Sequence, residues 1–381
     1  MQKIEFFRHN IGTREIREAT RVLRGLFLTT GREVERFETE LASFLEVPHV
    51  VGVTSCTGAL HLALTALGVG PGDEVITTPM TFAATALAVI QASAKPVFVD
   101  VEPQTGNLDA GLIESAITPK TKAILPVHLY GQMCDMRAIR RIAERHSLAV
   151  VEDAAHALEA GRDGVRVGEL SDAACFSFYA TKSITCGEGG AVATASEQLA
   201  RDIRRMRHHG MDKSAADRYG KDDVGYEITM MGWKYNMNNI QAALLLGQLA
   251  RAEKFLQKRT RLAGRYIEKL AGVPGIKIPQ PIPGCRHGWH LFTILVPPEK
   301  RREFVRRLKE MGIGVSINYV PVHLQKFFKE KFGFGKGAFP AAEAIGASTV
   351  SLPLYPKLTF KEQDVVVNAV RELAVELSLK D

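Results

Sequence analysis

The chain has 381 residues, of which 46% are hydrophobic and 24% are charged. This length is sufficient for two packed domains, and the composition excludes disorder on a large scale. Residues 1–9 lack the apolar stretch of a secretory signal, and no uncharged apolar run of about 18 residues follows. We therefore expect a cytoplasmic protein that does not enter a membrane.

The formal net charge of +7 allows an anionic partner. The densest basic patches, residues 204–209 and 326–331, contain apolar or acidic residues as well, which favours solvated helix faces over a nucleic-acid site. A phosphate-bearing small molecule is the anionic partner that we expect. The five cysteines form no CxxC pair, and an odd number indicates reduced thiols; we expect no metal site.

Apolar strand-like runs alternate with amphipathic helix patterns from about residue 50 to residue 210. This alternation predicts a three-layer α/β domain with a mainly parallel sheet. Helices are expected at 58–67 and 136–145, where apolar residues recur at helical spacing. Seven strands are expected, at residues 50–53, 74–77, 96–99, 121–127, 148–152, 174–178 and 190–194.

The pattern changes after about residue 250. A long helix is expected from residue 239 to residue 266, linking the two parts of the molecule. A strand at 289–296 and helices at 302–311 and 359–377 follow it, which predicts a smaller α+β domain. We place a large domain, with its N-terminal arm, at residues 1–250 and the small domain at residues 251–381.

Lys182 follows the sixth expected strand and precedes the glycine-rich turn 187–190. An amine at the mouth of an α/β sheet can lose its hydration, which lowers its pKa and frees its lone pair to attack a carbonyl. Most lysines in loops are simply solvated. The interpretation of Lys182 therefore depends on the residues that end the other strands, where ligands of α/β sheets bind.

Those residues have the properties of a cofactor site. Thr57 and Gly58 follow the first strand at the start of a helix, where they either bind a phosphate or only cap the helix. Phe82 follows the second strand and can cover a planar ring or fill a core. Asp153 ends a buried strand and needs a cationic partner such as a protonated pyridine. With Ser177 and the lysine, these groups match pyridoxal phosphate.

The motifs carry a resemblance to a known family. They are residues 54–58 (TSCTG), 152–156 (EDAAH), 176–182 (FSFYATK), 187–190 (GEGG), 232–236 (GWKYN), 323–325 (HLQ) and 351–354 (SLPL). With them the chain resembles the sugar aminotransferases of the DegT/DnrJ/EryC1/StrS family, which are fold-type-I pyridoxal-phosphate enzymes. The resemblance extends through essentially the whole chain.

The resemblance implies a role for each matching residue. Many relatives have Gly in place of Cys56 and Gln in place of His156. The implied cofactor is pyridoxal 5′-phosphate and the implied assembly a homodimer with shared active sites. By this resemblance, Lys182 forms the Schiff base, Asp153 contacts the pyridinium nitrogen and His156 lies beside the phenolic oxygen. Phe82 stacks on the ring. The phosphate is bound by Thr57, Gly58 and Ser177, and by Asn236 of the neighbouring subunit.

The resemblance also implies the reaction, in which glutamate donates nitrogen to a nucleotide-linked keto sugar and leaves as 2-oxoglutarate. Residues 184–190 and 287–292 are similar to members that aminate C4, and the enzymes of 4-amino-arabinose look closest. The product would be a 4-amino sugar for cell-surface polysaccharide, including lipopolysaccharide, or a related glycoconjugate.

The alternative functions are a 3-keto-sugar aminotransferase, a dehydratase or a regulator. Dehydratase relatives replace the lysine with histidine, whereas this chain has Lys182. A regulator would be expected to carry an added DNA-binding segment, and we expect none because the two domains account for all 381 residues.

The acceptor site is less defined. Tyr319 and His323 are candidates for contact with the sugar or nucleotide, together with Phe327 and Phe328. Packing between domains explains these side chains equally well, because aromatic residues more often fill cores. Residues 211–235 are a further candidate part of the acceptor site within a dimer.

Overall fold

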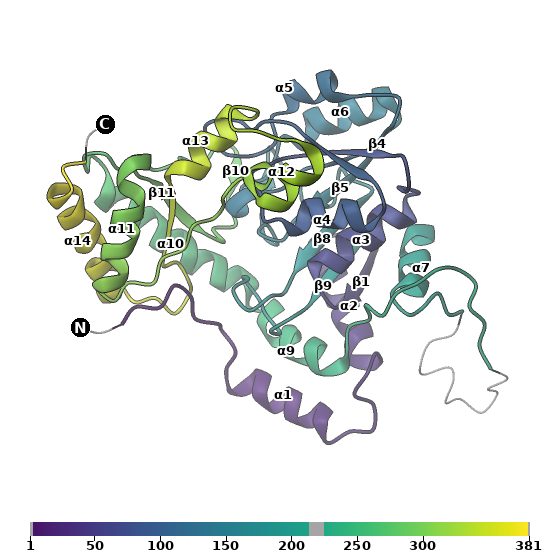
Figure 1. Cartoon of the computed structure of the whole chain (residues 1–381). Helices are drawn as coiled ribbons and strands as arrows, with labels where there is room; N and C mark the ends of the chain where they lie inside the picture. The colour runs from purple at the N-terminus through teal and green to yellow at the C-terminus, as the bar shows by residue number, and fades with distance from the viewer. Residues whose placement is uncertain (1–2, 213–224, 380–381) are drawn as a thin grey trace.

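The computed structural model of the chain describes residues 3–212 and 225–379 (Figure 1). A seven-stranded sheet, in the order β1-β9-β8-β5-β4-β2-β3, forms the centre of the larger region. Its strands are β1 (His49–Val53), β2 (Glu74–Thr77), β3 (Lys95–Phe98), β4 (Thr121–Leu125), β5 (Ala149–Asp153), β8 (Ala173–Ser177) and β9 (Gly190–Thr194). The prediction of a mainly parallel seven-stranded sheet is confirmed, and each strand lies within two residues of its expected range.

The direction of the strands places the residues that follow them at one edge. β3, β2, β4, β5 and β8 run parallel, whereas β9 pairs antiparallel with both β8 and β1. The carboxyl ends of parallel strands meet at the same edge of a sheet, which is where open α/β sheets bind ligands. The segments after β2, β5 and β8 are therefore neighbours in space.

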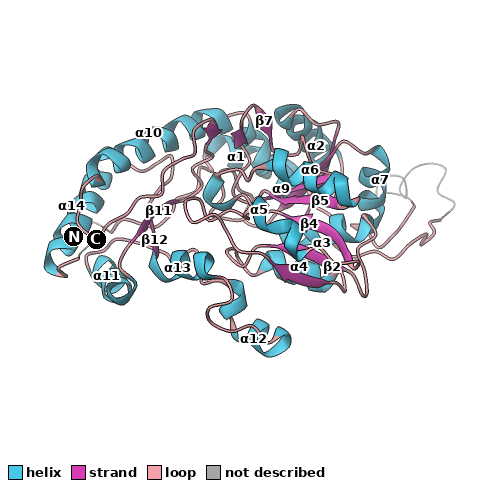
Figure 2. Cartoon of the chain, turned by 90° about the horizontal axis from the view of Figure 1, so that it is seen from above, coloured by secondary structure: helices cyan, strands magenta, loops and turns pink. Residues whose placement is uncertain are grey.

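Helices cover both faces of the sheet (Figure 2). α3 (Cys56–Ala66), α4 (Ala84–Gln91) and α7 (Glu197–Met206) cover one face, and α2 (Arg32–Leu45), α6 (Met136–His146) and α9 (Asn239–Leu249) cover the other. Successive strand residues point to opposite faces, so Val50 and Val51 are buried in two different apolar cores. This arrangement confirms the predicted three layers.

A second region has its own apolar core, which includes Tyr266, Phe292, Phe304 and Leu373. The antiparallel pair of β11 (Phe292–Leu295) and β12 (Thr349–Leu352) packs there with α10 (Ala252–Leu270), α11 (Pro298–Glu310) and α14 (Phe360–Glu376). Ile4 is buried in this core and its backbone pairs with Ile313, so the N-terminal arm packs on the C-terminal part (Figure 1). The domain boundary at residue 250 stays a prediction.

The predicted helix at 239–266 is wrong in one respect, because it is two helices, α9 and α10. Arg251 interrupts the helical backbone with φ of −116°. Its guanidinium donates to the carbonyl of Gly247 at 2.9 Å and to the carboxylate of Glu15 at 2.6 Å. Glu15 is buried in α1 (Thr13–Leu23). A tertiary ion pair therefore ends a helix whose sequence would allow it to continue.

The predicted strand at 289–296 is also shorter than expected. Trp289 adopts a left-handed backbone with φ of 46°, so that the ladder begins at Phe292. α12 (Lys326–Phe332) agrees with the helix face expected for the basic patch at 326–331. The remaining short elements were not expected from the sequence. They are α5 (Ala110–Ile113), α13 (Pro340–Ser348), the 3₁₀ turns η1 (Glu114–Ala116), η2 (Leu129–Gly131) and η3 (Val322–Leu324), and a small sheet of β10 (Cys285–Arg286), β6 (Gly161–Arg162) and β7 (Val165–Arg166).

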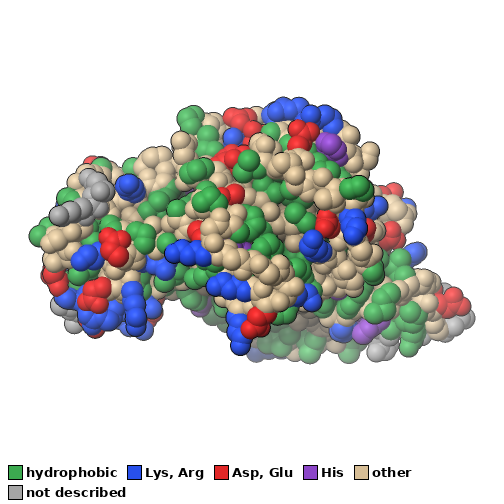
Figure 3. Space-filling model, turned by 45° about the horizontal axis from the view of Figure 1, so that its top comes forward, with side chains coloured by type: hydrophobic (Ala, Val, Ile, Leu, Met, Phe, Trp, Pro, Cys, Tyr) green, Lys and Arg blue, Asp and Glu red, His purple; other side chains and the backbone are tan. Residues whose placement is uncertain are grey.

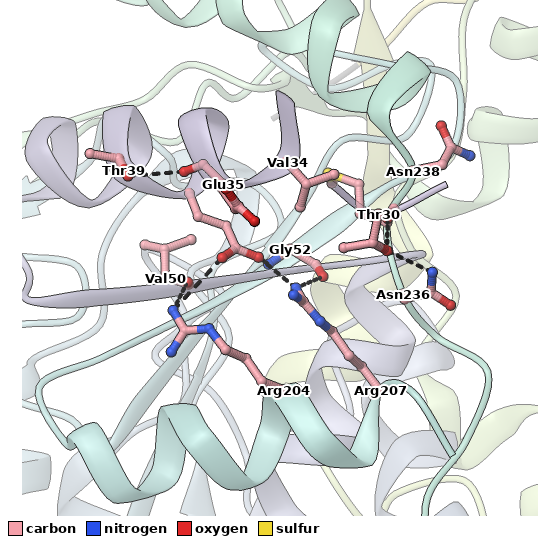
Figure 4. Close-up of polar contacts among 12 residues, drawn as sticks. Thr30, Val34, Glu35, Thr39, Val50, Gly52, Arg204, Arg207, Asn236 and Asn238 are labelled. Atoms are coloured by element: carbon pink, nitrogen blue, oxygen red, sulfur yellow. Dashed lines mark hydrogen bonds and ion pairs between the residues drawn. The ribbon is translucent and has the colours of Figure 1, made fainter. Parts of the chain in front are cut away.

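The first basic patch is in part a structural element. Arg207 is buried and donates to Glu38 of α2 at 2.5 Å and to the carbonyl of Gly52 at 2.6 Å. Arg204 donates to the carbonyl of Val50, and Figure 4 shows both guanidinium groups reaching from the α7 segment to β1. Glu38 also accepts the amide of Gly52 at 2.8 Å. These contacts join α2, β1 and the α7 segment through one buried carboxylate.

One face of the molecule shows a mixture of charges. On the face drawn in Figure 3, Lys and Arg side chains are interspersed with Asp and Glu side chains. In the second patch, Lys326 lies 3.8 Å from Glu330 on α12 and both are exposed. All five cysteines are free thiols. Within residues 3–212 and 225–379, no helix has the length and apolar character needed to cross a bilayer.

Candidate active site

A pocket of about 600 Å³ lies at the carboxyl ends of the parallel strands. Its walls come from the segments after β1, β2, β5 and β8 and from two segments of the second region, at 290–291 and 316–319. Seven of the residues predicted from the sequence line it, namely Thr57, Phe82, Asp153, His156, Ser177, Lys182 and Tyr319. The fold thus brings together side chains from five segments that are far apart in the sequence.

Lys182 places its amine in a desolvated environment. The turn after β8 is held by the bond from the Lys182 amide to the carbonyl of Tyr179 at 2.9 Å. The side-chain nitrogen lies 3.5 Å from Nε2 of His290. Burial lowers the pKa of Lys182 to about 8, which makes the free amine accessible near neutral pH. The amine is therefore suited to attack a carbonyl carbon.

Among the described residues, the buried acid Asp153 accepts hydrogen bonds from neutral groups alone. Its Oδ2 accepts the hydroxyl of Thr85 at 2.7 Å, and its Oδ1 accepts the amide of Ala155 at 3.1 Å. The thiol of Cys56 lies 3.9 Å from Oδ1. Burial raises the pKa of Asp153, and the bond from Thr85 opposes that rise. The carboxylate can therefore accept a cationic ligand group.

The tautomer of His156 follows from its partners. The backbone amide of Tyr130 can only donate, and it donates to Nδ1 of His156 at 3.2 Å. A neutral ring then carries its proton on Nε2, which lies 3.1 Å from the hydroxyl of Tyr319. Burial holds the pKa values of His156 and His290 well below the usual range, with the charge of Lys182 adding to the effect. Both rings are therefore neutral.

The start of α3 forms one end of the pocket. Ser55 caps this helix by accepting the amide of Gly58 at 3.0 Å, and Thr57 lies in its first turn. A Cβ at Gly190 would lie 2.4 Å from the backbone of Ser55, so only glycine allows β9 to pass this close to the helix. Hydroxyl groups at the positive end of a helix dipole suit a phosphate, and Ser177 adds another hydroxyl to the pocket.

Phe82 presents a bare aromatic ring to the pocket. Its side chain is 62% exposed, although most other large apolar side chains in the described residues are buried. The ring lies 6.0 Å from that of Tyr319, in a tilted arrangement. A planar ligand would cover this exposed apolar surface. The donor set therefore fits pyridoxal phosphate: an amine, an acid without a cationic hydrogen-bond partner, an uncovered aromatic face and hydroxyls at a helix N-terminus.

Comparison with known proteins agrees with this donor set. Residues 9–371 match the DegT/DnrJ/EryC1/StrS aminotransferase family. The chain belongs to this family. It is 44% identical over 369 residues to the spore coat polysaccharide biosynthesis protein SpsC of Bacillus subtilis, and the match covers 95% of each chain. The predicted membership among the sugar aminotransferases of the family is confirmed.

Solved structures of this aminotransferase family share the fold. DesV of S. venezuelae is 40% identical, with a TM-score of 0.88 over 94% of each chain. NtdA of Bacillus subtilis, solved with bound cofactor PMP, is 34% identical, with a TM-score of 0.87 over 98% of this chain and 85% of that chain. The predicted fold type I and the cofactor pyridoxal 5′-phosphate are confirmed. The closer likeness to 4-amino-arabinose enzymes stays a prediction.

Five predicted site residues of this aminotransferase do not line the pocket, and two of them, Phe327 and Phe328, lie on α12. The amide of Gly58 already donates to Ser55. The amide nitrogen of Asn236 donates to the hydroxyl of Thr30 at 2.7 Å, as Figure 4 shows, and its Oδ1 is buried without a hydrogen-bond partner among the described residues. His323 is fully buried in η3, where its Nε2 lies 3.0 Å from Glu343. Of the candidate acceptor segment at 211–235, residues 213–224 lie outside the described residues.

Several polar side chains in the pocket were not selected from the sequence, among them His290 and Thr85. His290 contacts the amine of Lys182, and its only signal was its place in a motif at 287–292. Thr85 contacts Asp153 although the two residues are 68 positions apart. Its only signal was that it follows Phe82 by three residues. Neither contact has a periodic or compositional signature.

Proposed function

We propose that this aminotransferase transfers nitrogen from glutamate to C4 of a nucleotide-linked keto sugar. The observation that carries the proposal is the convergence of Lys182, Asp153 and Phe82 on one pocket. A buried amine, a buried acid and an exposed aromatic ring are the protein groups that a pyridoxal-phosphate transaminase requires.

Bound pyridoxal phosphate supplies a carbonyl carbon that bonds to an amine and a ring that takes up the electrons left when a neighbouring carbon loses its proton. Lys182 would hold the cofactor through its Nζ between turnovers, and this Nζ would be free once an amino acid is bound. Its free Nζ then removes the proton from Cα of glutamate. In the second half of the reaction the same Nζ delivers a proton to the sugar carbon that receives the nitrogen.

The neighbouring residues support these proton transfers. Asp153 holds a proton on the ring nitrogen, which favours uptake of electrons by the ring. His156 carries a proton on Nε2 and so can donate toward the phenolic oxygen of the cofactor. His290 is neutral and its Nε2 lies 3.5 Å from the Lys182 amine, where it can orient that amine. Phe82 packs on one face of the ring.

We propose a keto sugar linked to a nucleotide as the acceptor. The pocket of about 600 Å³ is in the range that encloses small-molecule ligands. Tyr319 lines it, which supports its assignment to the acceptor site, whereas the position of His323 in this chain gives no such support. The similarity to SpsC supports a product used in a surface polysaccharide or related glycoconjugate. The net charge of +7 suits a diphosphate.

We also propose that the enzyme is a homodimer in which Asn236 contacts the phosphate bound by the other subunit. Its buried Oδ1 has no partner among the described residues, and such atoms are rare unless a further group satisfies them. Leu23, Leu26 and Phe27, in α1 and the segment that follows it, are exposed apolar side chains. Exposed apolar side chains near one another support a protein interface. The cytoplasmic location stays a prediction.

The alternatives differ in testable ways. Amination at C3 would use the same residues, so that only the position of the product nitrogen separates it from the proposal. A dehydratase would release no 2-oxoglutarate from glutamate. The retention of Lys182 supports transamination over this second alternative.

The decisive experiment is a panel of UDP-, dTDP- and GDP-linked keto sugars, with C3 and C4 ketones of each, assayed with glutamate. We expect formation of 2-oxoglutarate and of an amino sugar with one C4 ketone. Glutamate alone should bleach the yellow colour of the purified enzyme, because the first half of the reaction needs no sugar. Turnover confined to C3 ketones would exclude the proposed acceptor. Bleaching that requires sugar would exclude the two-stage reaction.

A further inference from the structure

The short segment between β2 and α4 contributes two different groups to the pocket. Phe82 turns its ring into the cavity, and Thr85, only 1% exposed, turns its hydroxyl toward Asp153. The distance from Thr85 Oγ1 to Asp153 Oδ2 is 2.7 Å. The amide of Thr85 also donates to the carbonyl of Phe82 at 3.2 Å, which closes the turn. A single turn therefore fixes both the aromatic face and a partner of the buried acid.

The direction of the hydrogen bonds follows from their chemistry. The Thr85 hydroxyl lies 2.7 Å from Oδ2 of Asp153 and 3.3 Å from the carbonyl of Phe82, and both of these groups only accept. The single hydroxyl proton therefore belongs to the nearer, charged acceptor, Asp153. The hydroxyl of Thr81 lies 2.7 Å from that of Thr85 and must then be the donor of that contact. Thr81 is also buried. The two threonines form a chain of hydroxyl groups whose donated protons all point toward the carboxylate, and such chains strengthen each bond in them.

Oδ1, the other carboxylate oxygen of Asp153, accepts weaker hydrogen bonds than Oδ2. Oδ1 accepts the amide of Ala155 at 3.1 Å, and the thiol of Cys56 is a weak donor at 3.9 Å. The titratable groups whose charges act on Asp153 are Lys182 and His128. Cys56, Cys175 and Tyr319 are buried neighbours whose own pKa values are raised, so that they are neutral near pH 7. Thr85 is therefore the strongest neutral donor to this carboxylate.

We infer that Thr85, oriented by Thr81, is a positioning residue that holds the Asp153 carboxylate in the ionised form and in the plane that faces the ring nitrogen of the cofactor. The inference rests on the proposed role of Asp153. The hydrogen bond from Thr85 lowers the pKa that burial raises, so it acts on the charge state as well as the orientation of the acid. Loss of the hydroxyl should weaken the contact with the ring nitrogen without removing any group that touches substrate.

The test compares Thr85→Val, which keeps the shape and removes the hydroxyl, with Thr85→Ser, which keeps the hydroxyl. Thr77→Val is a matched control, because Thr77 is equally buried on β2 but donates to the carbonyl of Leu125, away from the pocket. Two quantities are measured: the dissociation constant of pyridoxal phosphate from apoprotein, and the ¹⁵N chemical shift of the ring nitrogen in labelled, bound cofactor. Urea unfolding reports on stability.

We expect Thr85→Val to raise the dissociation constant about tenfold, which corresponds to one hydrogen bond to a charged group. The ¹⁵N shift should move toward that of a neutral pyridine. Thr85→Ser should restore both quantities, and Thr77→Val should change only the stability. If Thr85→Val fails to fold, Thr81→Val should move both quantities in the same direction by a smaller amount.

An unchanged ¹⁵N shift in Thr85→Val, or an equal shift in Thr77→Val, would overturn the inference. Asp153→Asn separates this failure from that of the proposed function. If Asp153→Asn moves the ¹⁵N shift and Thr85→Val does not, the acid acts as proposed without help from Thr85. If neither variant moves it, the role of Asp153 itself is wrong.

Discussion

Two buried carboxylates of this aminotransferase have opposite surroundings. Glu38 receives Arg207 at 2.5 Å, has Arg204 at 3.7 Å and accepts the amide of Gly52. Within residues 3–212 and 225–379, Asp153 accepts hydrogen bonds only from a hydroxyl, an amide and a weak thiol donor. A buried charge is costly unless it is paired. The structural acid thus has its counter-charge within the chain, whereas the acid of the site is left for a ligand to neutralise.

The same contrast holds for the cations. Arg207 is fixed between a carboxylate and a carbonyl, so it joins three elements and has no freedom to react. Among the described residues the Lys182 amine has one hydrogen-bond partner, a neutral imidazole, and burial lowers the pKa of Lys182 to about 8. Incomplete pairing distinguishes the groups that carry chemistry from those that hold the fold together.

The largest effect is expected for Lys182→Ala. The variant should lose turnover by at least about 10³-fold, because no other amine lines the pocket as described and the proton transfers depend on it. Its fold should be intact, since the side chain makes one hydrogen bond to the described residues, at 3.5 Å. Release of 2-oxoglutarate and circular dichroism check the two statements. A turnover rate equal to that of the wild-type enzyme would exclude the mechanism proposed above.

The two acids should respond differently to removal of their charge. Asp153→Asn should lower kcat/KM by about 10²- to 10³-fold while leaving the urea stability of the apoprotein nearly unchanged. Glu38→Gln should cost about 3 kcal/mol of stability, because it leaves Arg207 buried without its counter-charge. Its kcat per folded molecule should stay the same. Equal loss of stability in both variants would show that the contrast drawn here does not exist.

The pH dependence of cofactor loading tests the state of Lys182. Its amine is protonated below the lowered pKa of about 8 and free above it, so that loading should slow about tenfold per pH unit below pH 8 and level off above it. Stopped-flow absorbance after mixing apoprotein with pyridoxal phosphate measures this rate, and Lys182→Ala provides the blank. A midpoint near the ordinary lysine value would mean that the amine is hydrated.

The smallest effect is expected for Phe82→Ala, which should weaken cofactor binding about tenfold through loss of the ring contact. Its stability should change by less than about 0.5 kcal/mol, since the side chain is already 62% exposed. Phe178→Ala is the control, because that ring is fully buried and its removal should cost about 3 to 5 kcal/mol. A large stability loss in Phe82→Ala would assign the ring to the core instead.

Local patterns in the sequence were sufficient for much of the fold and for part of the site. Apolar runs of the right length predicted all seven strands of the large sheet, because strands covered on both faces consist mainly of apolar residues. The rule that ligands bind after parallel strands then selected Lys182, Asp153 and Phe82 from the sequence. The same reasoning from the residues included Ser177, and motif resemblance added His156; the structure also places both in the pocket.

The tertiary structure alone determined the contacts that connect distant segments. The break at Arg251 depends on Glu15, the partner of Asp153 is a threonine 68 residues away, and His323 faces Glu343 instead of the pocket. Each contact depends on how elements pack and on the register of the sheet, and neither is encoded in the spacing of nearby residues. The sequence by itself determined which groups stand at the ligand-binding edge, whereas packing determined which of them are paired and which are left to react.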